Sequence, residues 1–157
     1  GSFAVMLFFV MMAAGGCTGS TAGGLKALRL QVVGIAVGEQ MRRMVWPRRV
    51  LVRLYNGREL GDGVVASVML LVLAYIATVE ALALALAWLG LDPLTSLSGA
   101  LTAVANVGPG LGAVIGPAGN FAPLPDAAKW LLAGGMLLGR LEFVTVLVVL
   151  SPEFWRD

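Results

Sequence analysis

A short apolar segment runs into a glycine-rich one at residues 94–112, which read LTSLSGALTAVA and then NVGPGLG. Leu94 to Ala105 predicts a helix of about 12 residues, too short for a hydrocarbon core that needs about 20. Asp92 and Pro93 predict its start, because Asp92 can cap the helix and Pro93 suits its first turn. A short helix, a glycine-rich break and a loop (113–125) back to one surface are typical of a re-entrant pore helix.

The composition is that of an integral membrane protein. Of the 157 residues, 59% are hydrophobic and 13% are charged, and the mean hydropathy is +0.89. Soluble domains carry about 25% charged residues. With one cysteine and no histidine, the chain can form neither an intrachain disulfide nor a Cys–His pair. We find no Ser-His-Asp, paired-carboxylate or phosphate-loop motif, so we expect neither an enzyme nor a cofactor.

A second glycine-rich break, GGCTGSTAGG, covers Gly15 to Gly24. It separates two helix candidates, Phe3–Ala14 and Leu25 to about Met44, so we expect residues 1–46 to form one broken transmembrane helix. Non-helical backbone at membrane depth survives only inside protein or beside water. Small residues also allow close helix packing. Five glycines with three hydroxyl side chains favour instead a flexible intramembrane loop on the cytoplasmic side of a pore.

The basic residues are clustered, and the cluster predicts the orientation. Eight of the eleven Lys and Arg residues lie between Lys26 and Arg58. The positive-inside rule explains them better than nucleic-acid binding does. We therefore predict that residues 47–62 form a cytoplasmic connection. Residues 63–157 then form a repeat of helix, pore helix, filter and helix, and the C-terminus is cytoplasmic. Its two long helices are predicted at Val64–Leu91 and Ala127–Leu150.

Asn106 to Gly112 has the composition that a cation path requires. A cation stripped of water needs a ring of oxygen atoms, and backbone carbonyls supply them without burying a formal charge. Glycine lets the backbone turn its carbonyls toward an axis. An extracellular turn has a similar composition and remains the alternative.

Arg140 is predicted near the middle of the last helix. A charge at a helix centre costs about 2.5–3.5 kcal/mol on insertion scales, so it should face protein or water. One interpretation is a structural ion pair with Glu80 or Glu142. We favour an Arg140 that faces the pore axis, where it repels cations and its guanidinium holds loop carbonyls.

Several segments together resemble a known family over nearly the whole chain. Gly15 to Lys26, GGCTGSTAGGLK, resembles the intramembrane loop of TrkH/TrkG-type potassium uptake proteins of the Trk/Ktr/HKT superfamily. Asn106 to Gly112 resembles the selectivity filter of their fourth repeat. Further similar segments lie downstream: Asn120-Phe121, Pro125 to Trp130 and Leu138 to Glu142.

This resemblance implies an all-α membrane protein with a pseudo-fourfold, cation channel-like fold of four helix–pore helix–helix repeats. The chain then holds the last helix of repeat three and all of repeat four, a C-terminal fragment that we do not expect to conduct alone. The implied filter residues are Asn106, Val107, Gly108, Pro109 and Gly110, with K⁺ bound by the carbonyls of Val107 and Gly108. The implied gating loop is Gly19, Ser20, Thr21, Ala22, Gly23 and Gly24, toward which Arg140 projects.

The resemblance also implies partners and a location. They are potassium ion, the missing repeats, a second copy in a membrane homodimer, and a cytosolic nucleotide-binding (TrkA-like) subunit, in a bacterial cytoplasmic membrane. Two other functions remain open. A broken-helix secondary transporter usually places acidic or polar ligands at its breaks, and these breaks carry no acid. In a non-conducting membrane scaffold, the glycines would only pack helices.

Overall fold

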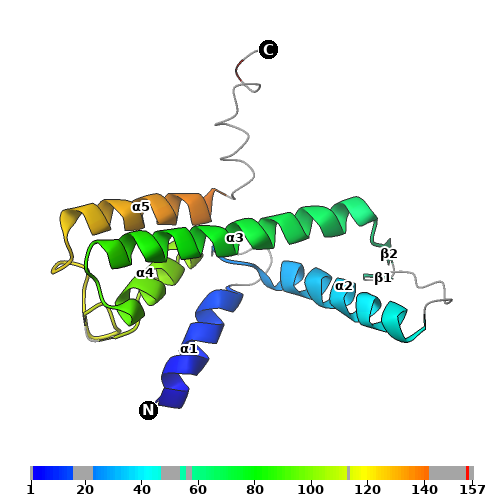
Figure 1. Cartoon of the computed structure of the whole chain (residues 1–157), viewed down its shortest axis with the longest axis horizontal. Helices are drawn as coiled ribbons and strands as arrows, with labels where there is room; N and C mark the ends of the chain where they lie inside the picture. The colour runs from blue at the N-terminus through cyan, green and yellow to red at the C-terminus, as the bar shows by residue number, and fades with distance from the viewer. Residues whose placement is uncertain are drawn as a thin grey trace.

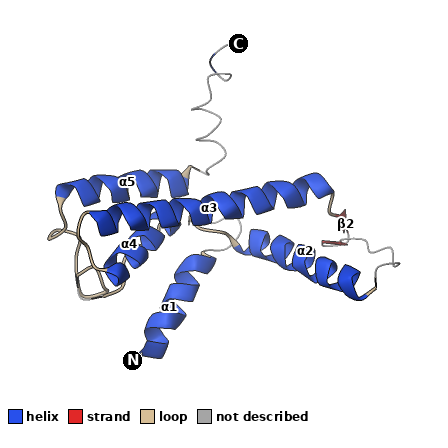
Figure 2. Cartoon of the chain, viewed as in Figure 1, coloured by secondary structure: helices blue, strands red, loops and turns tan. Residues whose placement is uncertain are grey.

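The computed structural model describes residues 2–15, 23–46, 54–55, 58–112, 114–141 and 155. These residues are mostly helical (Figures 1 and 2). The helices and strands are α1 (Ser2–Ala14), α2 (Ala27–Val45), β1 (Leu54–Tyr55), β2 (Arg58–Glu59), α3 (Asp62–Trp88), α4 (Pro93–Ala105) and α5 (Asp126–Arg140).

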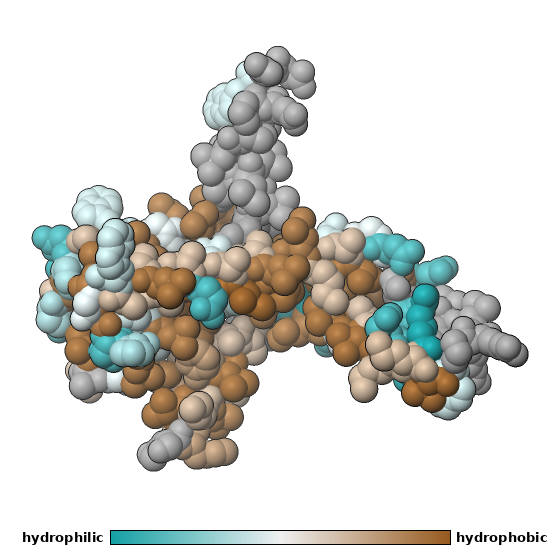
Figure 3. All heavy atoms as spheres, viewed as in Figure 1, coloured by the Kyte–Doolittle hydropathy of each residue, from teal (hydrophilic) through white to brown (hydrophobic). Residues whose placement is uncertain are grey.

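The longest helix, α3, organises the fold. Its 27 residues extend roughly 40 Å at 1.5 Å per residue. Within the described part of the chain, α3 is the one helix long and apolar enough to cross a membrane. Figure 3 shows apolar surface over the middle of the molecule and hydrophilic residues gathered toward its two ends. This banding is what a membrane-spanning protein requires, because apolar side chains must cover the part that lies in hydrocarbon.

The predicted start and end of the short helix are confirmed. Asp92 is the N-cap of α4, its carboxylate accepts a hydrogen bond from the Thr95 N–H at 3.0 Å, and Pro93 occupies the first helical position. The helix ends at Ala105 because Asn106 adopts the left-handed conformation, with φ 53° and ψ 42°. Asparagine is one of the few residues that tolerate this conformation.

After α4 the chain turns back along the helix from which it came. The hydroxyl of Thr102 contacts Gly108, and one turn earlier in α4 the hydroxyl of Ser98 contacts Leu111. The backbone thus retraces α4 toward its N-terminal end. The following loop reaches the same end of the molecule, where α5 begins (Figure 1). This path is the predicted re-entrant one.

The apolar core lies where α3, α4 and α5 meet. Its most buried large side chains include Leu86 of α3, Val104 of α4 and Ile115 of the loop, and Leu132 of α5 packs in the same cluster. Met12 brings α1 into this core. Because ten of the thirteen residues of α4 are buried, the short helix is held on several sides, as a segment that does not cross the membrane must be.

The N-terminal helix breaks where predicted, and its two halves then diverge. Helix α1 packs on α4 and α2 packs on α3, and in Figure 1 they leave the break in different directions. The ends of the break meet: a Cβ added at Gly15 would lie 3.1 Å from the Gly23 carbonyl oxygen. The chain therefore changes direction at this point, which a reading of helix length and hydropathy does not reveal.

The remaining boundaries lie within three residues of the predicted ones or partly outside the described residues. Helix α3 was predicted at Val64–Leu91 but runs from Asp62 to Trp88, because the chain turns at Gly90, which has φ +89°. Helix α2 ends at Val45 with Trp46 as its C-cap, and the next residue in the sequence is Pro47, which cannot continue a helix. Of the basic connection, the structure describes a short antiparallel β1–β2 pair. Helix α5 is described to Arg140, with Leu141 as C-cap, so the predicted continuation through 142–150 lies outside the described residues.

Candidate functional site

The candidate site begins at Asn106, directly after the last turn of α4. Its left-handed backbone turns the chain out of the helix. Its side-chain amide donates hydrogen bonds to the carbonyl of Met136 in α5, at 3.2 Å, and more weakly to that of Val104, at 3.5 Å. Asn106 therefore positions the start of segment 106–112 relative to α5, because it both turns the chain and bonds to that helix.

The next two N–H groups are both bound by Thr102. The Val107 N–H donates to the Thr102 carbonyl at 3.1 Å, and the Gly108 N–H donates to the Thr102 hydroxyl oxygen at 3.0 Å. One buried residue of the short helix thus accepts two successive backbone donors.

The N–H groups at the far end of the segment are bound as well. The Gly110 N–H donates to the Ile115 carbonyl at 2.8 Å. The Leu111 N–H donates to the Ser98 hydroxyl oxygen at 3.0 Å, and the Ser98 hydroxyl donates to the Leu111 carbonyl at 3.2 Å. Pro109 has no N–H to place. From Asn106 to Leu111, therefore, each backbone donor is bound to the protein.

The carbonyl groups are arranged in the opposite way. Among the described residues, none of the five carbonyl oxygens from Asn106 to Gly110 accepts a hydrogen bond. Val107, Gly108 and Pro109 are exposed. The backbone of Gly108 has φ +118°, a conformation that is routine for glycine and strained for other residues. The segment therefore presents oxygen atoms on the side away from α4.

The charge available at this place suits a cation. The C-terminal end of a helix carries a partial negative charge, and α4 ends directly at Asn106. Within the described residues, no group of three or more His, Cys, Asp or Glu side chains gathers at any site. The oxygen atoms of residues 106–110 are the backbone carbonyls and the side-chain amide oxygen of Asn106.

Two glycines from other parts of the chain pack closely against the end of α4. A Cβ at Gly23, the last part of the glycine-rich break, would lie 2.9 Å from the Val104 carbonyl oxygen. A Cβ at Gly139 of α5 would overlap the same oxygen. The break and the C-terminal end of α5 therefore both contact the last turn of α4, beside the candidate site.

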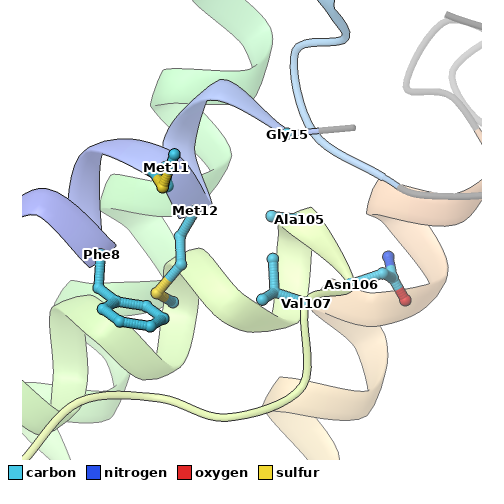
Figure 4. A pocket seen from close by; sticks show the side chains of 7 residues that line it. All are labelled: Phe8, Met11, Met12, Gly15, Ala105, Asn106 and Val107. Carbon is cyan, nitrogen blue, oxygen red and sulfur yellow. The ribbon is translucent and has the colours of Figure 1, made fainter. Parts of the chain in front are cut away.

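A cavity of about 390 Å³ opens at the same place. Phe8, Met11 and Met12 of α1 line one side of it, and the lining is completed by Gly15, Ala105, Asn106 and Val107 (Figure 4). Asn106 and Val107, the first two residues of segment 106–112, thus border an apolar cavity that reaches the start of the glycine-rich break.

The structure describes only some of the other predicted site residues. Gly23 and Gly24 lie against Ala105, whereas Gly19, Ser20, Thr21 and Ala22 lie outside the described residues. Arg140 is exposed at the end of α5. Among the described residues no ion pair joins it to Glu80, and Glu142 is not described. Its neighbour Gly139 contacts Val104, so Arg140 lies near the end of α4.

Sequence reasoning missed the residues that hold segment 106–112. Ser98 and Thr102 are four positions apart in a helix whose other residues are mostly apolar or small. Positions four apart share a helix face. Two hydroxyls at this spacing, directly before a glycine-rich break, were the available signal. The close contact of Gly139 with α4 was missed as well.

Comparison with known proteins identifies the family to which the chain belongs. A family profile described as "TrkH: Cation transport protein" matches residues 2–156. The chain belongs to the TrkH family. It is 54% identical to the Trk system potassium uptake protein TrkI of Halomonas elongata, over 157 residues that are all of this chain and 32% of that protein. It is 38% identical to TrkH of Vibrio parahaemolyticus, over 91% of this chain and 29% of that protein.

A solved structure of the TrkH family has the same fold. The crystal structure of the potassium transporter TrkH from Vibrio parahaemolyticus matches with a TM-score of 0.86 at 35% identity, covering 98% of this chain and 32% of that one. The predictions of an all-α membrane protein and of a Trk-type family are thereby confirmed. The chain spans about a third of the length of the TrkH-family relatives it matches.

Proposed function

We propose that this chain supplies one quarter of the selectivity filter of a Trk-type potassium uptake transporter, together with the loop that gates it. The observation that carries the proposal is the one-sided backbone of this segment, residues 106–112. Its N–H groups from Asn106 to Leu111 are bound to the protein, and its carbonyls from Asn106 to Gly110 accept no hydrogen bond among the described residues. Carbonyl oxygens arranged in this way can replace the hydration shell of K⁺.

In this proposal the carbonyls of Val107 and Gly108 bind the ion, and Asn106, Pro109 and Gly110 complete this chain's part of the filter. One such segment cannot surround an ion. The other ligands then come from the rest of the transporter, which is consistent with a chain that spans about a third of its relatives.

The gate is proposed to be the loop of residues 19–24. Support comes from its described end, where Gly23 packs on the last turn of α4 beside the filter segment. Arg140 is proposed to project toward this loop and to repel cations in the closed state. Its support is the contact of neighbouring Gly139 with the same turn of α4.

The assembly is also proposed. K⁺ moves down its electrochemical gradient through a homodimer in the bacterial cytoplasmic membrane, regulated by a cytosolic nucleotide-binding subunit. The basic cluster between Lys26 and Arg58 supports a cytoplasmic C-terminus through the positive-inside rule. Mass measurement of the intact transporter in detergent tests the dimer, and a reporter domain fused to the C-terminus tests the orientation.

The filter is tested by replacing Gly108 in the intact transporter. Gly108→Ala places a side chain at φ +118° and should abolish growth at low potassium in cells that lack other potassium uptake systems. Gly90→Ala is the matched control, because Gly90 also has positive φ (+89°), has nothing within 4 Å of an added Cβ, and lies in the turn before α4. If Gly108→Ala supports growth as well as the control does, the filter assignment is wrong.

A further inference from the structure

Two buried hydroxyl groups of α4 make bonds that hydroxyls in an isolated helix do not make. Ser98 is 0% exposed and Thr102 is 1% exposed. Serine and threonine inside helices commonly bond to a carbonyl one turn back, as Thr78 does to Ala74 and Ser67 does to Gly63 in α3. In α4, by contrast, the Thr102 and Ser98 oxygens accept hydrogen bonds from backbone N–H groups of segment 106–112.

The bond to Thr102 determines the direction of one particular carbonyl. In a trans peptide the C=O of one residue and the N–H of the next are coplanar and point to opposite sides, and no described peptide bond is cis. Because the Gly108 N–H points to the Thr102 hydroxyl in α4, the Val107 carbonyl points away from α4. The same reasoning applies to Ser98, whose bond with the Leu111 N–H turns the Gly110 carbonyl away.

The two hydroxyls therefore hold the two ends of the segment, six and thirteen residues along the chain from their partners. A valine in place of Thr102 has nearly the same shape and no acceptor. The Gly108 N–H would then be left without its partner in a part-buried position, and a donor that loses its partner favours reorientation of its peptide plane. That reorientation would turn the Val107 carbonyl out of place.

We infer that Thr102 and Ser98 are positioning residues for ion selection, and that Thr102 acts by aiming the Val107 carbonyl at the ion. The inference rests on the proposed filter. It assigns no ion contact to either hydroxyl. Loss of either hydroxyl should change which cation the transporter prefers. A purely structural role for these hydroxyls would not change that preference.

The test uses the intact transporter and compares uptake of K⁺ and Na⁺ at equal membrane abundance. Thr102→Val should lower the preference for K⁺ over Na⁺ about tenfold, the effect of losing one hydrogen bond to a part-buried donor. Thr102→Ser keeps the hydroxyl and should restore the preference. Ser96→Ala is the matched control, because Ser96 is buried in the same helix, donates to the Leu91 carbonyl at 3.3 Å and, among the described residues, makes no hydrogen bond to segment 106–112.

Each outcome is decisive. A Thr102→Val transporter that keeps the wild-type preference, while Gly108→Ala is inactive, overturns the inference and leaves the filter in place. If Gly108→Ala also transports normally, the proposed function falls and the inference falls with it. If Thr102→Val does not reach the membrane, Ser98→Ala decides the question. Its K⁺ preference should fall too, and an unchanged ratio overturns the inference.

Discussion

The side-chain amide of Asn106 donates a hydrogen bond to the backbone carbonyl of Met136, thirty residues further along the chain, at 3.2 Å. Asn106 is the left-handed residue that ends α4, and Met136 lies within α5. A single side chain thus connects the end of α4, the start of segment 106–112, and the last described helix. Changes in α5 can reach segment 106–112 through this bond.

Replacement of Asn106 should separate its two roles. Asn106→Ala puts alanine in the left-handed region, where it lacks the local side-chain hydrogen bonds that let asparagine adopt this conformation. It also removes the bond to Met136, so we expect a loss of about 2 kcal/mol in unfolding free energy. Asn106→Gly removes only the bond and should lose about half as much. Thermal unfolding of the purified intact transporter measures both. Equal stability of the alanine variant and the wild type would contradict this account.

The contact between Gly139 and α4 predicts a strong position dependence within one helix. Gly139→Ala introduces a methyl group that overlaps the Val104 carbonyl, and overpacking of this kind costs about 1–3 kcal/mol. Gly134→Ala is the control on the same helix, with nothing within 4 Å of the added atom. It should be neutral, or stabilising by up to about 1 kcal/mol because alanine favours helix. Similar melting temperatures for both variants would show that α5 does not approach α4 this closely.

The cap of α4 predicts a pH dependence. The hydroxyl and the backbone N–H of Thr95 lower the pKa of Asp92 below its ordinary value. The ionised carboxylate thus stabilises the folded state above the unfolded-state pKa, and that stabilisation is lost as the pH falls through the lowered pKa. Asp92→Asn keeps an acceptor and does not titrate. Between pH 7 and pH 3 the wild type should lose more thermal stability than Asp92→Asn, and parallel curves would refute the assignment.

The gating proposal predicts a gain of function. Deleting residues 19–21 shortens the proposed gate and should raise K⁺ flux in the intact transporter, measured as Rb⁺ uptake into vesicles. The same deletion combined with Gly108→Ala should show no added flux, because the ion path itself is then blocked. Unchanged flux in the single deletion counts against a gating role for this loop.

Substitution of Arg140 is a second test of the proposed gate. Arg140→Gln removes the positive charge and keeps hydrogen-bonding capacity, so we expect higher flux under conditions that close the pore. Arg140→Lys keeps the charge without the planar guanidinium and should lie between Arg140→Gln and the wild type. If Arg140→Gln reduces flux instead, the residue supports conduction and does not oppose it.

Local signals in the sequence predicted the elements well. Asp92 and Pro93 marked the start of α4, Asn106 ended it, and the break at Gly15 separated α1 from α2. Each of these depends on one to four neighbouring residues, through caps, proline geometry or glycine conformations. The agreement of α4 with its predicted end at Ala105 shows how strongly such local preferences act in a short helix.

Contacts between distant residues were not predictable in the same way. The spacing of Ser98 and Thr102 marks a shared helix face, but it does not identify Leu111 as the partner of Ser98. The contact of Gly139 with Val104 leaves no sequence pattern, because it depends on how the helices are placed in space. The divergence of α1 and α2 has the same origin, because packing against different helices determines it. The predicted gate residues 19–22 and the assignment of Val107 and Gly108 as K⁺ ligands remain predictions.

The proximity of Gly15 to the Gly23 carbonyl means that the polypeptide leaves and rejoins its helical scaffold at nearly one point. The number of residues between those points then has little influence on where α1 and α2 sit, and each doubling of such an insertion costs only about 0.6 kcal/mol in closure entropy. Under the proposed gating role, evolution can lengthen or trim this stretch to change how readily ions pass, while the placement of α1 and α2 stays the same.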